Sequence, residues 1–370
     1  MNFEFLHPNL YKVRVSKLYN QKYIIYKRYI KRIVSDFIFT RYTSFRKILN
    51  LFLVLINHYI IRGKKVYAYP IKITVDPTSY CNLRCPLCPT GRGDISRTKG
   101  FMSFDTFKKI IDELKDFIFV VDLFNWGEPF LNKQIFDFIS YAHSKRIKTR
   151  VSTNLNFFKD DFALKLIESG LDELVVSIDG ASEETYSRYR IGGNFTKVMN
   201  NLERIVETKR KMKSKKPKIL WQFIIMKHNE SEIEKAVSIS KRLGIEISFI
   251  PTRADMGEEV RLSDEEKIQR YKDWFPSQRF SRYNDREKKI KPKTCLFLWT
   301  QGTINWDGSV SGCCAIYPQS ADFGNIISDG GFMRVWNNQK FQYARYIVKN
   351  RIPDESVICS GCIKNGFIEP

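Results

Sequence analysis

Three cysteines stand close together in the first third of the chain, at Cys81, Cys85 and Cys88. Their spacing, C-x3-C-x2-C, places three thiolates on one short loop, where they suit three irons of a four-iron cluster. The fourth iron would lack a protein ligand, so a small molecule could bind there and receive an electron. A zinc knuckle is the alternative, but zinc usually takes four ligands and the nearest downstream histidine is His143.

A second group of cysteines lies in the last quarter of the chain, at Cys295, Cys313, Cys359 and Cys362, with Cys314 left over. Four thiolates can close a tetrahedral zinc site or ligate a four-iron cluster fully. Cys314 is either an alternative ligand to Cys313 or a small buried apolar side chain. The chain shows no secretory signal pattern, so its eight cysteines indicate metal binding in a reducing, cytoplasmic compartment rather than a disulfide framework.

The elements that must position these residues alternate between strand and helix six times. This alternation predicts parallel strands with crossover helices, in an open or partial β/α barrel whose active site lies at the carboxyl ends of the strands. The predicted strands cover residues 71–75, 117–124, 147–151, 174–178, 219–226 and 245–251, and the predicted helices cover 103–116, 131–145, 160–169, 182–190, 195–211 and 230–243.

Polar residues follow the second, third and fourth predicted strands, at the end where an active site is expected. A carboxylate such as Glu128 suits an ammonium group, a glycine beside it allows close backbone approach, and an arginine suits a carboxylate. Each residue alone is more often a turn or surface residue, but their placement at successive strand ends favours a site. The candidates are Trp126, Gly127, Glu128, Pro129, Ser152, Asn154, Ser177, Asp179 and Arg190.

The character of the sequence changes after the sixth predicted strand. Residues 253–291 are highly charged and weakly patterned, which indicates a connector. Beyond them, Gly302–Val310 predicts a hairpin with Asp-Gly at its turn, and a helix is expected from Phe332 to Lys349. We therefore divide the chain into a basic, aromatic-rich helical extension, a β/α core, the connector and a small α+β domain, at residues 1–69, 70–252, 253–291 and 292–370.

The positive charge is concentrated at the start of the chain. The net charge is +22, and residues 1–65 contain fourteen Lys or Arg against two acids, Glu4 and Asp36. This bias indicates an anionic partner, either lipid headgroups or nucleic acid. The apolar run Ile48–Ile61 is too short to span a bilayer. It predicts either a helix in the membrane interface or a helix packed on the main domain.

The cysteine loop after the first strand resembles the signature of the radical S-adenosylmethionine (SAM) superfamily. The residues within it, Tyr80-Cys81-Asn82-Leu83-Arg84-Cys85, are similar to those of family members at this motif. The resemblance covers residues 70–366. It implies a partial (β/α)6 TIM-like barrel and a [4Fe-4S] cluster that binds SAM. It also implies that the motif from Trp126 to Pro129 binds the SAM amine, and that Ser177 and Arg190 bind its carboxylate. Ser152 and Asn154 would then contact the ribose.

The second cysteine group resembles the twitch domain, a short form of the SPASM domain found in radical SAM enzymes. A full SPASM region carries about seven cysteines for two clusters, so one auxiliary [4Fe-4S] cluster is expected here. Structural zinc fits the spacing nearly as well. By resemblance to related radical epimerases, Cys314 is also a speculative hydrogen-atom donor to a substrate radical.

The resemblance implies that a flavodoxin or ferredoxin reduces the first cluster, and that SAM is then cleaved to a 5′-deoxyadenosyl radical that takes hydrogen from a substrate. The leading hypothesis for that substrate is a sugar, aminocyclitol or lipid-linked glycan intermediate, dehydrogenated or epimerised, with peripheral membrane contact through residues 1–65. The alternative is a peptide or protein maturase. A metal-stabilised nucleic-acid binder without enzyme activity is the remote hypothesis, so nucleic acid is not an expected partner.

Overall fold

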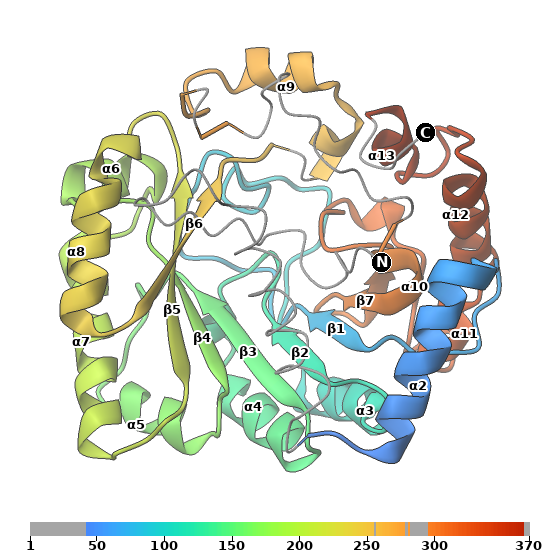
Figure 1. Cartoon of the computed structure of the whole chain (residues 1–370), viewed down its shortest axis with the longest axis horizontal. Coiled ribbons are helices and arrows are strands. Elements are labelled where there is room, and N and C mark those ends of the chain that lie inside the picture. Colours follow the sequence, from blue (N-terminus) through green and yellow to red (C-terminus); the bar gives the residue numbers. More distant parts are fainter. Residues whose placement is uncertain (1–41, 255–256, 278–279, 282–294, 366–370) are drawn as a thin grey trace.

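The computed structural model describes residues 42–254, 257–277, 280–281 and 295–365. Its centre is one curved, nine-stranded sheet in the order β6-β5-β4-β3-β2-β1-β7-β8-β9 (Figure 1). Neighbouring strands from β6 to β7 run parallel, and β8 and β9 pair antiparallel. The strands are β1 (Lys72–Val75), β2 (Val120–Leu123), β3 (Lys148–Thr153), β4 (Glu173–Ser177), β5 (Lys218–Ile225), β6 (Glu246–Pro251), β7 (Gln301–Ile304), β8 (Ser309–Ser311) and β9 (Gly324–Asn325).

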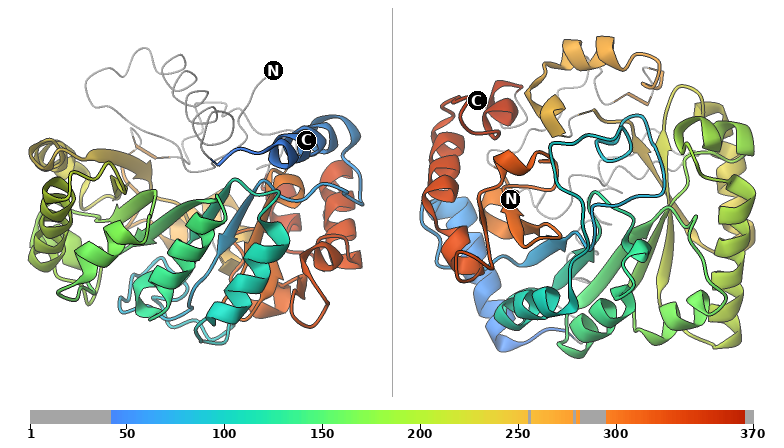
Figure 2. Two further views of the ribbon diagram at one scale, coloured as in Figure 1. Left: turned by 90° about the horizontal axis from the view of Figure 1, so that it is seen from below. Right: turned by 180° about the vertical axis from the view of Figure 1, so that it is seen from behind.

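Helices connect the parallel strands and lie along the outside of the sheet, as both figures of the whole chain show (Figures 1 and 2). Side-chain caps at their first residues fix several starts, including Ser103, Ser182 and Asn194. The crossover helices are α3 (Phe104–Leu114), α4 (Ile135–Ser144), α5 (Phe162–Glu168), α6 (Glu183–Tyr189), α7 (Phe195–Lys211) and α8 (Ile233–Leu243).

The two faces of the sheet differ in chemistry because side chains alternate along each strand. The outer face, toward the helices, is apolar and belongs to the main core. The inner face is polar. Outer residues include Ile73, Val75, Val121, Leu123, Val151, Val176, Trp221 and Phe223, and the strand registers place Lys72, Thr74, Asp122, Arg150, Ser152, Ser177, Gln222, Gln301 and Thr303 together on the inner face.

The predicted alternation of six strands and six helices is confirmed, although several bounds differ from the prediction by a few residues. Two differences in the predicted helices have clear local causes. The helix expected from residue 131 begins at Ile135, because Pro129–Leu131 forms a separate 3-10 turn, η3. The helix expected over Phe332–Lys349 is two helices, α11 (Phe332–Trp336) and α12 (Gln339–Asn350). The break occurs at Asn338, whose side chain accepts a hydrogen bond from the Phe341 amide and so caps α12.

The small C-terminal α+β domain continues the sheet of the core. Its predicted hairpin is β7 and β8, and β7 pairs parallel with β1, so that Thr303 lies beside Thr74. The described part of the charged connector contains a 3-10 helix, η5 (Gly257–Arg261), and α9 (Asp264–Arg270), which no pattern had predicted. The domain also holds η6 (Gln319–Ala321), α10 (Phe297–Thr300) and α13 (Ser360–Lys364).

Of the basic extension, the structure describes only residues 42–69, and the rest of the predicted segment 1–41 lies outside the described residues. The predicted apolar helix is α2 (Phe45–Ile56), followed by a π-helical turn, η2 (Asn57–Ile61). Among the helices that the structure describes, none has the length and apolar character needed to cross a bilayer.

Candidate active site

Cys81, Cys85 and Cys88 lie on the loop between β1 and α3, at the carboxyl end of the strand. Burial raises the pKa of Cys81 to about 12 and that of Cys85 to about 11, and it also raises the pKa of Cys88. The pKa of Cys81 is raised further by the other two thiols, because the three lie near one another. One loop therefore carries three neighbouring thiols whose surroundings disfavour the thiolate, and a bound metal would keep them ionised, which fits a cluster held by three cysteines.

Two of the predicted polar residues reach the sulfurs of this loop. The Asn154 side-chain nitrogen lies 3.8 Å from Cys81 Sγ, and Arg190 Nη1 lies 3.8 Å from Cys85 Sγ. Asn154 also donates to the Asn82 side chain at 2.8 Å, which ties the end of β3 to the cysteine loop. Donors of this kind orient a cluster and tune its potential.

Gly127 and Glu128 bring the end of β2 against the cysteine loop. Gly127 packs so closely on the loop that an added Cβ would lie 1.9 Å from the Thr78 carbonyl oxygen, so only glycine fits there. The Glu128 amide donates to the Tyr80 carbonyl at 2.8 Å. Its carboxylate accepts from Thr153 Oγ1 and from the Asn154 amide, each at 2.7 Å. Burial raises the pKa of Glu128 to about 7.

The residues predicted after β3 and β4 also meet. The hydroxyls of Ser152 and Ser177 lie 3.3 Å apart on neighbouring strands. Arg190 forms an ion pair with the fully buried Asp179 through Nε and Nη2, each 2.6 Å from Oδ2. This pair holds the guanidinium in one orientation, with its Nη1 toward Cys85. Asp179 therefore acts on the site through Arg190.

The predicted residue Trp126 points elsewhere. Its indole nitrogen donates to the Ile316 carbonyl at 3.2 Å, and its ring packs edge-on against Tyr317, so the side chain contacts the C-terminal domain. Pro129 is buried in η3 and shapes the turn after Glu128.

Asp76 is a residue that the sequence analysis missed. It is fully buried and accepts from the amides of Trp126 and Gly127, and burial raises its pKa to about 7. It therefore positions the turn that carries Glu128. Its place one residue after the first predicted strand was the available signal.

The C-terminal cysteines gather from three separate segments. Cys313 and Cys362 pack on a small apolar cluster with Ile316 and Ile358. Burial raises the pKa of Cys313, and the neighbouring thiols of Cys314, Cys362, Cys295 and Cys359 raise it further, so these thiols lie near Cys313. This donor set fits a fully ligated cluster.

Cys314 is the fifth cysteine of this region. Burial raises the pKa of its thiol, and the charges of Arg253, Lys72 and Asp122 act on it, so it lies near charged residues of the sheet as well as near Cys313. Of the two adjacent cysteines, Cys313 is the one that packs with Cys362 on the cluster of Ile316 and Ile358.

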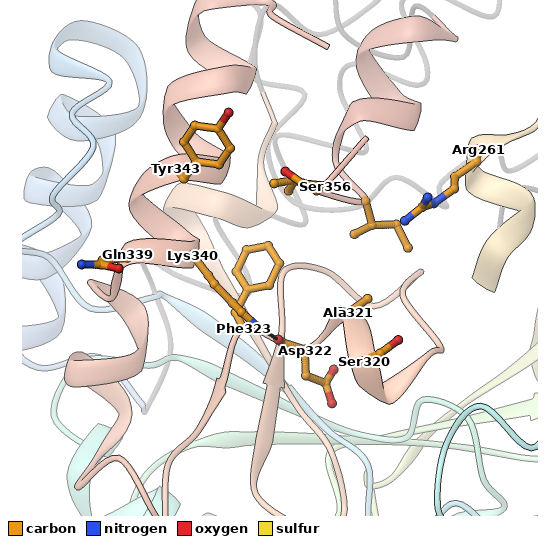
Figure 3. A pocket seen from close by; sticks show the side chains of 11 residues that line it. Arg261, Ser320, Ala321, Asp322, Phe323, Gln339, Lys340, Tyr343 and Ser356 are labelled. Atoms are coloured by element: carbon orange, nitrogen blue, oxygen red, sulfur yellow. Dashed lines mark hydrogen bonds between the residues drawn. The ribbon is translucent and has the colours of Figure 1, made fainter. Parts of the chain in front are cut away.

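Within the described residues, no three His, Cys, Asp or Glu side chains converge closely enough to hold a single metal ion. The cysteines of a four-iron cluster bind different irons, so their sulfurs stand farther apart than the ligands of one zinc ion. A cavity of about 360 Å³ lies in the C-terminal domain, between η6 and α12 (Figure 3). It is lined by residues such as Asp322, Phe323 and Tyr343 and by none of the predicted site residues.

Two sequence profiles match this chain. The profile described as "Radical SAM superfamily" matches residues 75–238, and the one described as "Iron-sulfur cluster-binding domain", SPASM, matches residues 295–363. The chain belongs to the radical SAM superfamily and carries a SPASM domain. Its cofactors are therefore a [4Fe-4S] cluster, SAM and an auxiliary iron–sulfur centre in the SPASM domain.

Similarity to known proteins covers a longer part of the chain than either profile. The mycofactocin maturase MftC of Mycobacterium ulcerans (strain Agy99) is 24% identical over 317 residues, which cover 79% of this chain and 80% of the relative. The crystal structure of Streptococcus suis SuiB bound to S-adenosylmethionine is 15% identical with a TM-score of 0.56, covering 77% of this radical SAM chain and 69% of SuiB. SuiB bound to the precursor peptide SuiA is also 15% identical, with a TM-score of 0.55 and coverages of 74% and 66%. These structures share the fold of this chain.

Proposed function

We propose that this radical SAM enzyme modifies a peptide or protein substrate. The observation that carries the proposal is the match to a mycofactocin maturase over about four-fifths of both chains. The likeness in fold to SuiB, whose structure was solved with a precursor peptide, supports it. The comparisons thus favour the peptide alternative over the sugar or aminocyclitol substrate that led the sequence analysis.

In this proposal, Cys81, Cys85 and Cys88 hold the SAM-binding cluster. When bound and reduced there, SAM supplies a carbon radical that takes hydrogen from the substrate. The Glu128 carboxylate would accept hydrogen bonds from the SAM amine, and positive charge on that group would favour the ionised form of this buried acid. Arg190, held by Asp179, would bind the SAM carboxylate together with Ser177, and Ser152 and Asn154 would contact the ribose hydroxyls.

We assign the auxiliary cluster to Cys295, Cys313, Cys359 and Cys362, because Cys313 packs with Cys362 on the cluster of Ile316 and Ile358, and the thiols of Cys295 and Cys359 act on it. Cys314 is left out of this set because the charges of Lys72 and Asp122 also act on its thiol. Cys314 keeps its proposed role as a hydrogen donor. A four-cysteine site leaves no iron open to SAM, so its role is to pass electrons or to brace the site. A flavodoxin- or ferredoxin-type protein is the proposed electron donor.

The proposal is tested with the reconstituted enzyme under anaerobic conditions, using SAM, dithionite and short peptides encoded beside the gene. We expect 5′-deoxyadenosine to form in step with a mass change in one peptide. The sharpest control replaces the peptides with sugars or aminocyclitols. A product from that control, with every peptide unchanged, would contradict the proposal and restore the glycan hypothesis.

We also propose that α2 and η2 contact a membrane surface. One face of this segment carries exposed apolar side chains at helical spacing: Phe45, Leu49, Phe52, Leu53, Ile56 and Ile60. The face toward the protein is partly polar, because Lys47 donates to the Arg146 carbonyl and Asn50 exchanges hydrogen bonds with the backbone of Tyr69. This arrangement inverts the usual one, in which the apolar side of a surface helix faces the core.

The composition of the sequence that contains this segment favours one kind of membrane. Residues 1–65 hold fourteen Lys or Arg against two acids, which favours anionic lipid over neutral lipid. Vesicle flotation tests the idea: the chain should float with phosphatidylserine vesicles and stay behind with phosphatidylcholine. Changing Phe45 and Phe52 to Ser should release it, while the same change at the exposed Tyr343 of α12 should have no effect. Equal flotation of the wild type, the Phe45 and Phe52 variant and the Tyr343 variant would exclude this face of α2 as the membrane contact.

A further inference from the structure

Part of the charged connector, residues 257–277, lies against the loop of the first cysteine group. These residues form η5, α9 and the turn that follows α9, and Figure 1 shows them at the top of the view, between β6 and α13. We call residues 257–277 the connector segment. None of the proposed SAM-binding residues comes from it, so its place beside the cysteines needs another explanation.

Apolar side chains join the connector segment to the cysteine loop. A buried apolar cluster, separate from the main core, contains residues of both. Its loop members are Leu83, Cys85 and Leu87, and its members from the connector segment are Tyr271 and Phe275. It is bordered by the partly buried residues Cys81, Cys88 and Trp274. All three cysteines therefore belong to, or pack against, an apolar cluster that the connector segment helps to build.

Three polar side chains fasten the connector segment to the loop. Arg92 follows Cys88 by four residues, and its amide donates to the Cys88 carbonyl at 2.9 Å. Its Nη1 donates to Glu259 Oε1 at 2.8 Å and to the Tyr271 hydroxyl at 2.7 Å. The Tyr271 hydroxyl donates to the same carboxylate oxygen at 2.7 Å. We call Arg92, Glu259 and Tyr271 the clasp, which joins the cysteine loop to η5 and to the end of α9.

The clasp is an ion pair with a buried acid. Glu259 is buried, Arg92 is more exposed, and Arg270 reaches the same carboxylate oxygen at 4.0 Å. Burial alone would raise the pKa of Glu259, but the hydrogen bonds from Arg92 and Tyr271 lower it below its ordinary value. Hydrogen bonds to an ionised carboxylate are stronger than those between neutral groups, so the clasp favours the closed arrangement.

The two ends of the connector segment are held by different parts of the chain. At one end, the Gly257 amide donates to the Ala315 carbonyl of the C-terminal domain at 2.7 Å. At the other end, the Ser277 amide donates to Glu230 Oε2, which lies beyond β5, at 2.8 Å. The connector segment therefore crosses the cysteine loop from the C-terminal domain to the far side of the sheet.

We propose that the connector segment is a cover for the SAM-binding cluster, and that Arg92, Glu259 and Tyr271 are positioning residues that hold this cover on the cysteine loop. A cover keeps water and oxygen from the cluster, and solvent exposure is one of the properties that set a cluster's potential. The C-terminal cysteines belong to other apolar clusters, so opening the cover would expose the first group alone. This inference rests on the proposed function only where that function assigns the three cysteines to the SAM-binding cluster, and it does not depend on the substrate.

Hydrogen–deuterium exchange in the reconstituted full chain, kept free of oxygen, tests the cover. Covered amides exchange only while a local opening exposes them, so their rates report the open fraction. Glu259→Gln removes the charge that Arg92 binds and should speed exchange over residues 259–275 and 85–92 about tenfold or more. The amides of α12 should exchange as in the wild type. Glu113→Gln is the matched control, because Glu113 also accepts hydrogen bonds from another segment but binds the start of α11.

Exposure of the same proteins to air gives a second measurement. Oxygen takes electrons from an iron–sulfur cluster that it can reach, and the cluster then loses iron. Electron paramagnetic resonance after reduction with dithionite separates the two clusters, because SAM should change the signal of the first one only. In Glu259→Gln the SAM-sensitive signal should be lost about tenfold faster than in the wild type, while the other signal lasts as long as before. A merely structural role of Glu259 would not produce this selectivity.

Unchanged exchange in Glu259→Gln would overturn the proposal, and so would faster exchange over the whole chain, which indicates a general loss of stability. If Glu259→Gln does not fold, Tyr271→Phe decides the question. This variant loses one hydroxyl, keeps the ring and should speed exchange of the same amides about threefold, whereas exchange equal to the wild type would refute the cover. Peptide modification without selective opening in these variants would refute the cover and leave the proposed function standing. Selective opening in a chain that modifies no peptide would instead refute the proposed function alone.

Discussion

The two groups of cysteines offer the same thiolate ligands, but the first group has polar neighbours and the second has apolar neighbours. Cys81, Cys85 and Cys88 come from one loop, and polar donors from Asn154 and Arg190 reach their sulfurs. The C-terminal four come from three segments and pack on apolar side chains. On the proposed assignment, three cysteine ligands would leave one iron open to SAM beside polar side chains, while four cysteine ligands would close the second cluster.

The largest expected effect separates the two groups by mutation. Cys85→Ala removes one of only three ligands and should reduce 5′-deoxyadenosine formation about a thousandfold or more, equal to about 4 kcal/mol of activation free energy. Cys359→Ala should leave SAM cleavage within about tenfold of the wild type and abolish the peptide product. A chromatographic assay of 5′-deoxyadenosine measures both. If Cys359→Ala lost SAM cleavage as completely as Cys85→Ala, the division of roles would be wrong.

The next prediction concerns the link between the regions. Arg97, which follows the cysteine loop, forms a fully buried, two-point ion pair with Asp322 of the C-terminal domain, at 2.8 and 3.0 Å. Arg97→Ala leaves a buried carboxylate without its partner and should lower the free energy of unfolding by about 3–5 kcal/mol. Chemical denaturation measures the change.

The exposed ion pair Lys165–Asp161 provides the control, because Lys165→Ala should leave the denaturation midpoint nearly unchanged. Should Arg97→Ala behave like that control, the two regions are held together by other contacts.

A smaller effect is expected within the SAM pocket. Glu128→Gln keeps the shape of the side chain but removes the charge that would face the SAM ammonium. We expect SAM affinity to fall about 10- to 100-fold, or roughly 1.5–3 kcal/mol, as measured by equilibrium dialysis. Glu113→Gln, at the amides that begin α11, is the matched control. Full SAM affinity in Glu128→Gln would remove this residue from the pocket.

The smallest expected effect is a dependence of the free energy of unfolding on pH, caused by His58, where η2 contacts the C-terminal domain. Burial, helped by Arg62, lowers the pKa of His58 to about 4, and its ring packs edge-on against Trp299 of α10. Because the folded pKa lies below the unfolded value of about 6.5, the unfolded chain binds the proton more readily, and stability falls as the pH drops below 6.5. Between pH 8 and pH 6 the cost is about 1 kcal/mol.

Urea denaturation at the two pH values measures this cost, and His58→Leu should remove most of the difference. An unaltered pH dependence in that variant would mean that other groups cause it.

The sequence predicted the features that short spacings encode. The cysteine loop, the six alternating units and the polar residues at strand ends are local patterns, and the structure brings Glu128, Asn154 and Arg190 to the loop. Pairings between distant strands were not predictable. Lys72, Asp122 and Arg150 are far apart in sequence and meet only through the registers of three strands.

Two further features could not be predicted from the sequence, because they also depend on contacts between distant parts of the chain. The choice between Cys313 and Cys314 depends on which way one turn faces, and the outward apolar face of α2 depends on what its other side contacts. Hydrophobic periodicity shows that a helix has an apolar face, but it does not show whether that face is turned toward the core.

The central claim is that one cluster is open to SAM and the other is closed. Mössbauer spectroscopy of the chain reconstituted with iron-57 tests it directly, with and without SAM. We predict about eight irons per chain, four for each cluster, and a changed signal from a single iron of one cluster when SAM is added. SAM-dependent changes in both clusters, or in neither, would contradict the claim.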